Sequence, residues 1–190
     1  MKRIGILGGT FDPPHLGHLT MAEYVYEEMG LDEVWFMPSY IPPHKEEAST
    51  DADKRVAMVE RAISGHPDFR VCDIERKREG TSYTVDTMRD LKRLYPEVIF
   101  YFIIGGDMVE HLPKWNRIEE LVDIVQFVGV NRPGYERSHE IPVEFVDIPS
   151  VDISSTVIRE RVAAGKSIRY IVPESVTQYM KEYGLYETDS

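Results

Sequence analysis

The alternation of short apolar runs with helical patterns is the feature of this 190-residue sequence that most constrains its fold. The apolar runs are rich in Val, Ile and Phe, and several are nearly continuous, as in strands that are buried on both faces of a parallel sheet. The runs cover residues 3–7, 33–37, 69–74, 98–104, 124–130 and 143–148. Helical patterns occupy 17–29, 51–64, 84–94 and a shorter stretch after Asn116. This βαβ alternation predicts an α/β fold with a doubly wound parallel sheet and right-handed crossovers.

Two further helices are expected at the C-terminal end. The stretch SSTVIRERVAAG begins with hydroxyl residues suited to N-caps and stops at Gly165. The stretch VPESVTQYMKEYG has Pro173 in a first-turn position and ends at Gly184. Because no repeat, low-complexity tract or linker interrupts the chain, we expect one domain over residues 1–190.

Composition and charge narrow the functional classes. The sequence is 42% hydrophobic and 29% charged, as expected of a globular protein, and its formal net charge is −11. A net negative charge has the wrong sign for a surface that binds nucleic acid in general. An anionic ligand must therefore be met by a local basic pocket. No apolar run approaches the roughly 20 residues of a membrane-spanning helix, and no signal-peptide core follows Met1, so a cytoplasmic protein without a membrane partner is expected. The single cysteine, Cys72, lies in a predicted strand and is interpreted as a buried, inert thiol.

The turn after the first predicted strand reads GGTFDPPHLGH, residues 8–18, and predicts a phosphate-binding site. In open α/β sheets, ligands bind beyond the carboxyl ends of the strands, and the first strand-to-helix turn receives phosphates on backbone N–H groups. Gly8 and Gly9 allow the backbone to approach an anion closely. The two prolines that follow place His15 at the entrance of the helix, and His18 falls on the same side of its first turn. Two imidazoles could therefore face a phosphate together with the N–H groups of the helix.

Other interpretations of the two histidines stay open from the residues alone. His15 and His18 could bind a metal ion, although only Asp12 offers a nearby third ligand. Both histidines could instead merely cap or pack the helix. The spacing Gly5-x-x-Gly8-Gly9 does not match the G-x-G-x-x-G fingerprint of dinucleotide-binding folds.

The sequence also resembles a known family in several motifs. GGTFDPPHLGH is similar to the H-x-G-H signature of the nucleotidyltransferase superfamily, and ISSTVIR, residues 153–159, is similar to its second signature. Together with PPHK, TSYTVDT, IGGDM, LPKW and the closing VPESVTQYMKEYGLY, these motifs resemble the bacterial nicotinate-nucleotide adenylyltransferases over almost the whole chain. The resemblance implies a Rossmann-like nucleotidyltransferase fold with C-terminal helices. It also implies the transfer of an adenylyl group from ATP to nicotinate mononucleotide in NAD synthesis, with Mg²⁺ accompanying the ATP.

The resemblance assigns roles on the ATP side of such a site. His15 and His18 would contact the phosphates as catalytic residues, with Arg159 forking to an oxyanion from the helix after the second signature. Asp107 would lie at the sheet edge beside the first turn if the strand order is 3-2-1-4-5, where its carboxylate suits a ribose hydroxyl. The remaining ATP contacts would come from Gly8, Gly9, Thr10, Phe11, Ser154, Ser155 and Thr156.

On the side of the second substrate, the resemblance implies a pyridine ring stacked on Trp115 and a nicotinate carboxylate that accepts a hydrogen bond from Thr84. His44, Lys45 and Arg132 would neutralise the phosphate or carboxylate of the mononucleotide. Two alternatives remain: a related adenylyltransferase that uses another phosphate acceptor, such as phosphopantetheine, and a non-catalytic nucleotide sensor on the same fold. The sequence is compatible with a homo-oligomer and does not specify one.

Overall fold

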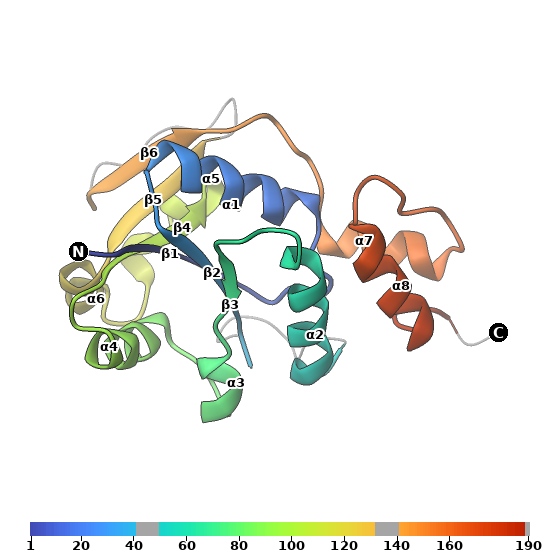
Figure 1. Cartoon of the computed structure of the whole chain (residues 1–190), viewed down its shortest axis with the longest axis horizontal. Coiled ribbons are helices and arrows are strands. Elements are labelled where there is room, and N and C mark those ends of the chain that lie inside the picture. The colour runs from blue at the N-terminus through green and yellow to red at the C-terminus, as the bar shows by residue number, and fades with distance from the viewer. Residues whose placement is uncertain (41–49, 132–140, 189–190) are drawn as a thin grey trace.

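The computed structural model describes residues 1–40, 50–131 and 141–188. Within them, six strands form one parallel sheet in the order β3-β2-β1-β4-β5-β6 (Figure 1). The strands are β1 (Arg3–Gly9), β2 (Glu33–Pro38), β3 (Phe69–Val71), β4 (Ile99–Gly105), β5 (Gln126–Asn131) and β6 (Val143–Asp147). The doubly wound parallel sheet is confirmed. The order 3-2-1-4-5, on which the expected placement of Asp107 depends, is the one observed, and β6 extends it by one strand.

Helices cover both faces of this sheet (Figure 1). In chain order they are α1 (Leu16–Glu28), α2 (Ala52–Ile63), α3 (Ile74–Arg78), α4 (Thr84–Leu94), α5 (Gly106–Val109), the 3-10 turn η1 (Leu112–Lys114), α6 (Ile118–Ile124), α7 (Ser155–Ala163) and α8 (Glu174–Glu182). Side chains of α1 and α2 pack with one set of sheet residues, and those of α4 and α6 pack with the opposite set. None of the helices in the part of the chain that the structure describes is long and apolar enough to cross a membrane.

The first strand shows how the alternating sequence builds these two layers. Ile4 and Ile6 are buried in the cluster that contains α4, whereas Leu7 is buried in the cluster that contains α1. Gly5 lies where a Cβ atom would come within 2.8 Å of Leu31 Cδ1. Strand β1 is thus buried on both faces, as its continuous apolar run predicts.

The C-terminal helices α7 and α8 pack beside α2 at one end of the molecule (Figure 1). Their shared apolar cluster contains Met58 of α2, Ile158 of α7 and Val176 of α8. Gly165 and Gly184 both have a positive φ, of 67° and 60°, which explains why glycine ends both helical segments. Pro173 is the N-cap of α8 rather than a first-turn residue.

One predicted strand is wrong in its second half. The apolar run 69–74 forms a strand only to Val71, because residues from Ile74 onward coil into α3. The backbone N–H of Cys72 still donates to the carbonyl of Phe36 at 2.8 Å, so the ladder ends there. Ile74 then packs against the α4 side of the core, and Glu75 is only 4% exposed. Packing against α4 decides this boundary, and a continuous apolar run cannot reveal it.

Candidate functional site

The loop between β1 and α1 lies where the strand order reverses. Strand β1 has β2 on one side and β4 on the other, and the chain leaves it toward the carboxyl edge of the sheet. This is the position at which open α/β sheets bind ligands. Helix α1 begins immediately after the loop, so the positive end of its dipole lies at the same edge of the sheet.

His15 and His18 form a reciprocal cap at the start of α1. His15 Nδ1 accepts the N–H of Gly17 at 3.0 Å, and His18 Nδ1 accepts the N–H of His15 at 3.1 Å. The rings are stacked with their centroids 3.8 Å apart. A nitrogen that accepts a hydrogen bond carries no proton, so each neutral ring holds its proton on Nε2. Capping therefore sets the tautomer that presents an N–H donor on the far side of each ring.

The close packing of the His15 ring explains why a glycine stands at position 17. A Cβ atom at this position would lie 2.7 Å from Cε1 and 2.9 Å from Nδ1 of His15. Any side chain would therefore displace the His15 ring from its capping position. Phe11 supports the pair from the other side, because its buried ring meets the His18 ring edge-on at 4.8 Å.

The start of α7 packs against the same loop. Ser155 Oγ donates to the carbonyl of Pro13 at 2.8 Å, and Arg159 Nη1 donates to the carbonyl of Asp12 at 2.9 Å. Ser154 is the N-cap of α7 and accepts the N–H of Val157, while Thr156 accepts from Arg159 Nη2 at 3.3 Å. The structure thus brings the two signature segments together, although they are 142 or more residues apart in sequence.

Asp107 lies at the same edge of the sheet. It is an exposed residue of α5, directly after β4, and β4 is hydrogen-bonded to β1. Its carboxylate folds back over Gly105, where an added Cβ atom would lie 2.8 Å from Oδ1. The two glycines of the loop pack closely against aromatic rings. At Gly9 a Cβ atom would meet the Phe11 ring at 3.3 Å, and at Gly8 it would meet Phe102 at 3.4 Å.

Comparison with known proteins identifies this arrangement. The sequence matches the Cytidylyltransferase-like family over residues 6–161. A protein of Oceanobacillus iheyensis is 57% identical over 186 residues, which are 98% of this chain and 97% of that protein. The nicotinate-nucleotide adenylyltransferase of Bacillus subtilis (strain 168) is 51% identical over 189 residues, which are 99% of this chain and 100% of that enzyme. The chain belongs to the nicotinate-nucleotide adenylyltransferase family.

A solved structure agrees with the fold. The nicotinic acid mononucleotide adenylyltransferase of Plasmodium falciparum, complexed with NaAD, superposes with a TM-score of 0.83. It is 23% identical, and the match covers 98% of both chains. At this identity the likeness shows the fold alone, which is the Rossmann-like nucleotidyltransferase fold with C-terminal helices that the sequence motifs predict.

The residues expected on the mononucleotide side are only partly described. His44, Lys45 and Arg132 lie outside the described residues. Trp115 follows η1 and is half-buried, with its ring edge-on to Phe102 at 5.9 Å and to Phe127 at 6.2 Å. Trp115 is thus partly a core residue, as isolated tryptophans commonly are, and part of its surface remains accessible.

Thr84 is the first residue of α4, and the next turn of that helix is fixed by a buried network. The hydroxyl of Thr87 donates to Glu75 at 2.9 Å and accepts from Arg78 at 2.6 Å. Burial raises the pKa of Glu75 above its ordinary value, while the hydrogen bond from Thr87 and the charge of Arg78 act in the opposite direction. Sequence analysis missed Glu75 because it assigned no helix to this segment.

The geometry of the two histidines bears on the metal-binding alternative. Residues 1–40, 50–131 and 141–188 contain no group of three His, Cys, Asp or Glu side chains that could hold a metal ion. The Nδ1 atoms of His15 and His18 also already accept backbone hydrogen bonds. The two rings are thus placed to donate hydrogen bonds rather than to coordinate a cation through Nδ1.

Arg55 is the most important residue that sequence analysis missed. It is 1% exposed and donates to four carbonyl groups: from Nε to Thr50 at 2.9 Å, from Nη1 to Thr10 at 2.9 Å and Ser39 at 2.6 Å, and from Nη2 to Tyr40 at 3.1 Å. Burial lowers the pKa of its guanidinium, and the charge of Asp12 opposes that effect. Arg55 therefore ties the phosphate loop to the end of β2 and to the segment before α2.

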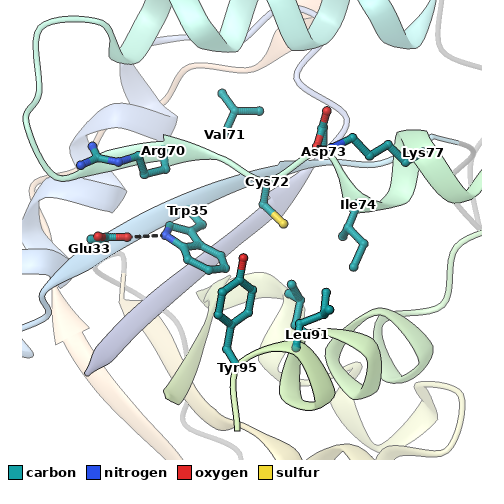
Figure 2. A pocket seen from close by; sticks show the side chains of 11 residues that line it. Glu33, Trp35, Arg70, Val71, Cys72, Asp73, Ile74, Lys77, Leu91 and Tyr95 are labelled. Carbon is teal, nitrogen blue, oxygen red and sulfur yellow. Dashed lines mark hydrogen bonds and ion pairs between the residues drawn. The ribbon is translucent and has the colours of Figure 1, made fainter. Parts of the chain in front are cut away.

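A separate cavity of about 420 Å³ lies beside the β2–β3 edge, on the side of α3 and α4 (Figure 2). Trp35 and Tyr95 line it on one side, and the sulfur of Cys72 points into it on the side of Ile74 (Figure 2). Burial raises the pKa of the Cys72 thiol to about 11, so the thiolate is scarce at neutral pH. None of the described residues assigned to the substrates lines this cavity. Cys72 is half-buried rather than fully buried as predicted, and its raised pKa agrees with its interpretation as an inert thiol.

Proposed function

We propose that the chain transfers the adenylyl group of ATP to nicotinate mononucleotide, forming nicotinate adenine dinucleotide and releasing pyrophosphate. The observation that carries this proposal is the reciprocal cap of His15 and His18 at the topological switch point. Because each ring accepts a hydrogen bond through Nδ1, each would donate from Nε2 to an ATP phosphate. The name of the Bacillus subtilis relative supplies the acceptor.

The reaction needs positioning and charge stabilisation rather than a general base. The phosphate of the mononucleotide is already ionised, and its oxygen attacks the α-phosphorus of ATP while the bond to the bridging oxygen of pyrophosphate breaks. Negative charge grows on the leaving pyrophosphate and on the α-phosphate oxygens. His15 and His18 would donate to these oxygens from one side, and the start of α7 with Arg159 from the other.

The other ligand contacts follow from this arrangement. One wall of the phosphate site would be the loop after β1, with Gly8, Gly9, Thr10 and Phe11. The opposite wall would be the start of α7, with Ser154, Ser155 and Thr156. Asp107 would hold a ribose hydroxyl at the neighbouring strand end.

On the acceptor side, the pyridine ring would stack on Trp115, and Thr84 would donate to the nicotinate carboxylate. His44, Lys45 and Arg132 would neutralise the charges of the mononucleotide. Magnesium would arrive on the triphosphate as part of the substrate and supply charge neutralisation there.

A pyrophosphate-release assay tests this function. ATP and Mg²⁺ are supplied with nicotinate mononucleotide, with its amide analogue or with phosphopantetheine, in separate reactions. The proposal predicts the highest kcat/KM with nicotinate mononucleotide and the appearance of nicotinate adenine dinucleotide in equal amount to pyrophosphate. Faster turnover with phosphopantetheine would identify a different acceptor. Nucleotide binding without turnover on any acceptor would identify a sensor.

The metal requirement gives a second test. We expect protein dialysed against EDTA to contain no tightly held transition metal and to regain full activity when Mg²⁺ is added with ATP, because the described residues offer no three-ligand site. Elemental analysis of the dialysed wild type and of His15→Ala checks this expectation. A transition metal that survives dialysis in the wild type and is absent from His15→Ala would overturn it.

Trp115→Ala should weaken the binding of nicotinate mononucleotide by about 1 to 3 kcal/mol, the range for bases stacked on aromatic side chains, and leave ATP affinity nearly unchanged. Calorimetric titration with each ligand measures the difference. Trp35→Ala is the matched control, because Trp35 is also half-buried and edge-on to two aromatic rings but lines the separate cavity. Equal losses for both ligands, or equal losses in the two variants, would show that Trp115 only supports the core.

A further inference from the structure

The segment after α8 folds back onto the phosphate loop. Tyr186 has a positive φ of 65°, and its hydroxyl donates to Asp12 Oδ1 across 174 residues of sequence. Nearby, the carbonyl of Ile171 accepts the N–H of Leu16, the first residue of α1. The C-terminal end of the chain is thus in direct contact with the residues on both sides of His15.

Asp12 is the point at which these contacts meet. It is 4% exposed and lies three residues before His15 in the loop. Tyr186 holds its carboxylate, and Arg159 holds its backbone carbonyl at 2.9 Å. The charge of Arg55 also faces this group. A movement of Asp12 would therefore move the loop that delivers His15 to the start of α1.

The environment of Tyr186 keeps its hydroxyl a donor. Burial raises the pKa of the phenol, and the hydrogen bond to Asp12 raises it further. The hydroxyl also interacts with the side chain of Thr50, a residue that is 6% exposed, and with the positive charge of Arg159. Because Asp12 is nearly fully buried, water cannot readily replace a donor that is removed from its carboxylate.

The apolar part of Tyr186 has a separate role. Its ring, with Leu185, packs against the apolar cluster formed by α2, α7 and α8. A phenylalanine at position 186 would preserve this packing and remove only the hydroxyl. The two contributions of the residue can therefore be separated by one conservative substitution.

We propose that Tyr186 is a positioning residue for adenylyl transfer: its hydroxyl fixes Asp12, and through Asp12 it holds the loop and His15 in the geometry that receives the ATP phosphates. This inference rests on the proposed function and assigns the C-terminal segment a part in it. We expect Tyr186 to affect the binding of ATP rather than of the mononucleotide. Its hydroxyl interacts with Asp12 and Thr50, and the charges of Arg55 and Arg159 lie near it.

The test compares Tyr186→Phe with the wild type and with Tyr183→Phe. Tyr183 is an exposed tyrosine at the end of α8. Its ring contacts the ring of Tyr179 and lies beneath the ammonium group of Lys54, rather than on the phosphate loop. We expect Tyr186→Phe to lower kcat/KM for ATP about tenfold, as befits the loss of one hydrogen bond to a charged group. KM for the mononucleotide should stay at its wild-type value, whereas the thermal midpoint should fall by several degrees, because the buried Asp12 carboxylate loses a donor. Tyr183→Phe should match the wild type throughout.

A double-mutant cycle with Asp12→Asn checks the route of the effect. If Tyr186 acts through Asp12, the double variant should lose no more ATP efficiency than Asp12→Asn alone. Wild-type kcat/KM for ATP in Tyr186→Phe would overturn the proposal, and so would an equal rise in KM for ATP and for the mononucleotide. ATP binding measured by calorimetry without the second substrate keeps the two proposals apart. A wild type that forms no dinucleotide overturns the function alone, whereas unchanged ATP affinity and turnover in Tyr186→Phe overturn the positioning role alone.

Discussion

His18→Ala should lower kcat by about 10²- to 10³-fold, the usual cost of losing one preorganised donor to a developing oxyanion. The Nδ1 atom of His18 accepts the N–H of His15, so its Nε2–H is the donor that we expect to contact the substrate. Steady-state turnover with nicotinate mononucleotide and ATP, measured on folded protein, gives the number. Because His18 also completes the cap of α1, a loss of about 0.5 to 2 kcal/mol in the free energy of unfolding should accompany the substitution.

A second variant separates capping from catalysis. In His18→Gln, the side-chain oxygen at the third helical position can still accept the N–H of His15, as in a capping box. We expect it to regain most of the lost stability and little of the lost turnover. His66→Ala is the matched control, since His66 also accepts a backbone N–H through Nδ1 and stacks on an aromatic ring, but it lies beside Phe69. If His18→Ala turned over at the wild-type rate, the histidine would be a cap and nothing more.

Arg55→Ala should destabilise the protein by about 3 to 5 kcal/mol, because the change leaves four carbonyl groups without their donor and removes a buried positive charge near Asp12. Chemical unfolding followed by circular dichroism measures the free energy. A chain of this size should then melt lower by about 2 to 4 °C for each kcal/mol. The phosphate loop should lose its fixed conformation first, because the carbonyl of Thr10 loses its hydrogen bond from Arg55 of α2.

The controls for Arg55 lie on the same helix. Arg61→Ala removes an exposed guanidinium that lies over the Tyr179 ring, and such a contact contributes only about 0.5 to 1 kcal/mol. Arg55→Lys keeps the charge but not the planar fork, so it should remain close to the alanine variant. Unfolding of Arg55→Ala within 1 kcal/mol of the wild type would mean that water or a shifted side chain satisfies the carbonyls equally well.

Local patterns predicted most of the architecture. The helix over 84–94 was predicted at its observed bounds, and the parallel sheet followed from the alternation of elements. The cluster of Gly17 with two histidines also pointed to the start of α1, because the steric and capping requirements there involve residues within three positions of one another. Such short-range constraints are fully contained in a stretch of sequence.

Interactions between distant segments were decided by the tertiary structure alone. In the sequence, Arg55 is one of several basic residues on an amphipathic helix, yet it reaches a carbonyl 45 residues away. Tyr186 lies next to the chain end and meets Asp12 across 174 residues. The end of β3 likewise depends on α4, against which Ile74 packs. Periodicity records which face of an element is buried, whereas the partner of a buried polar group is chosen only when separate elements are packed together.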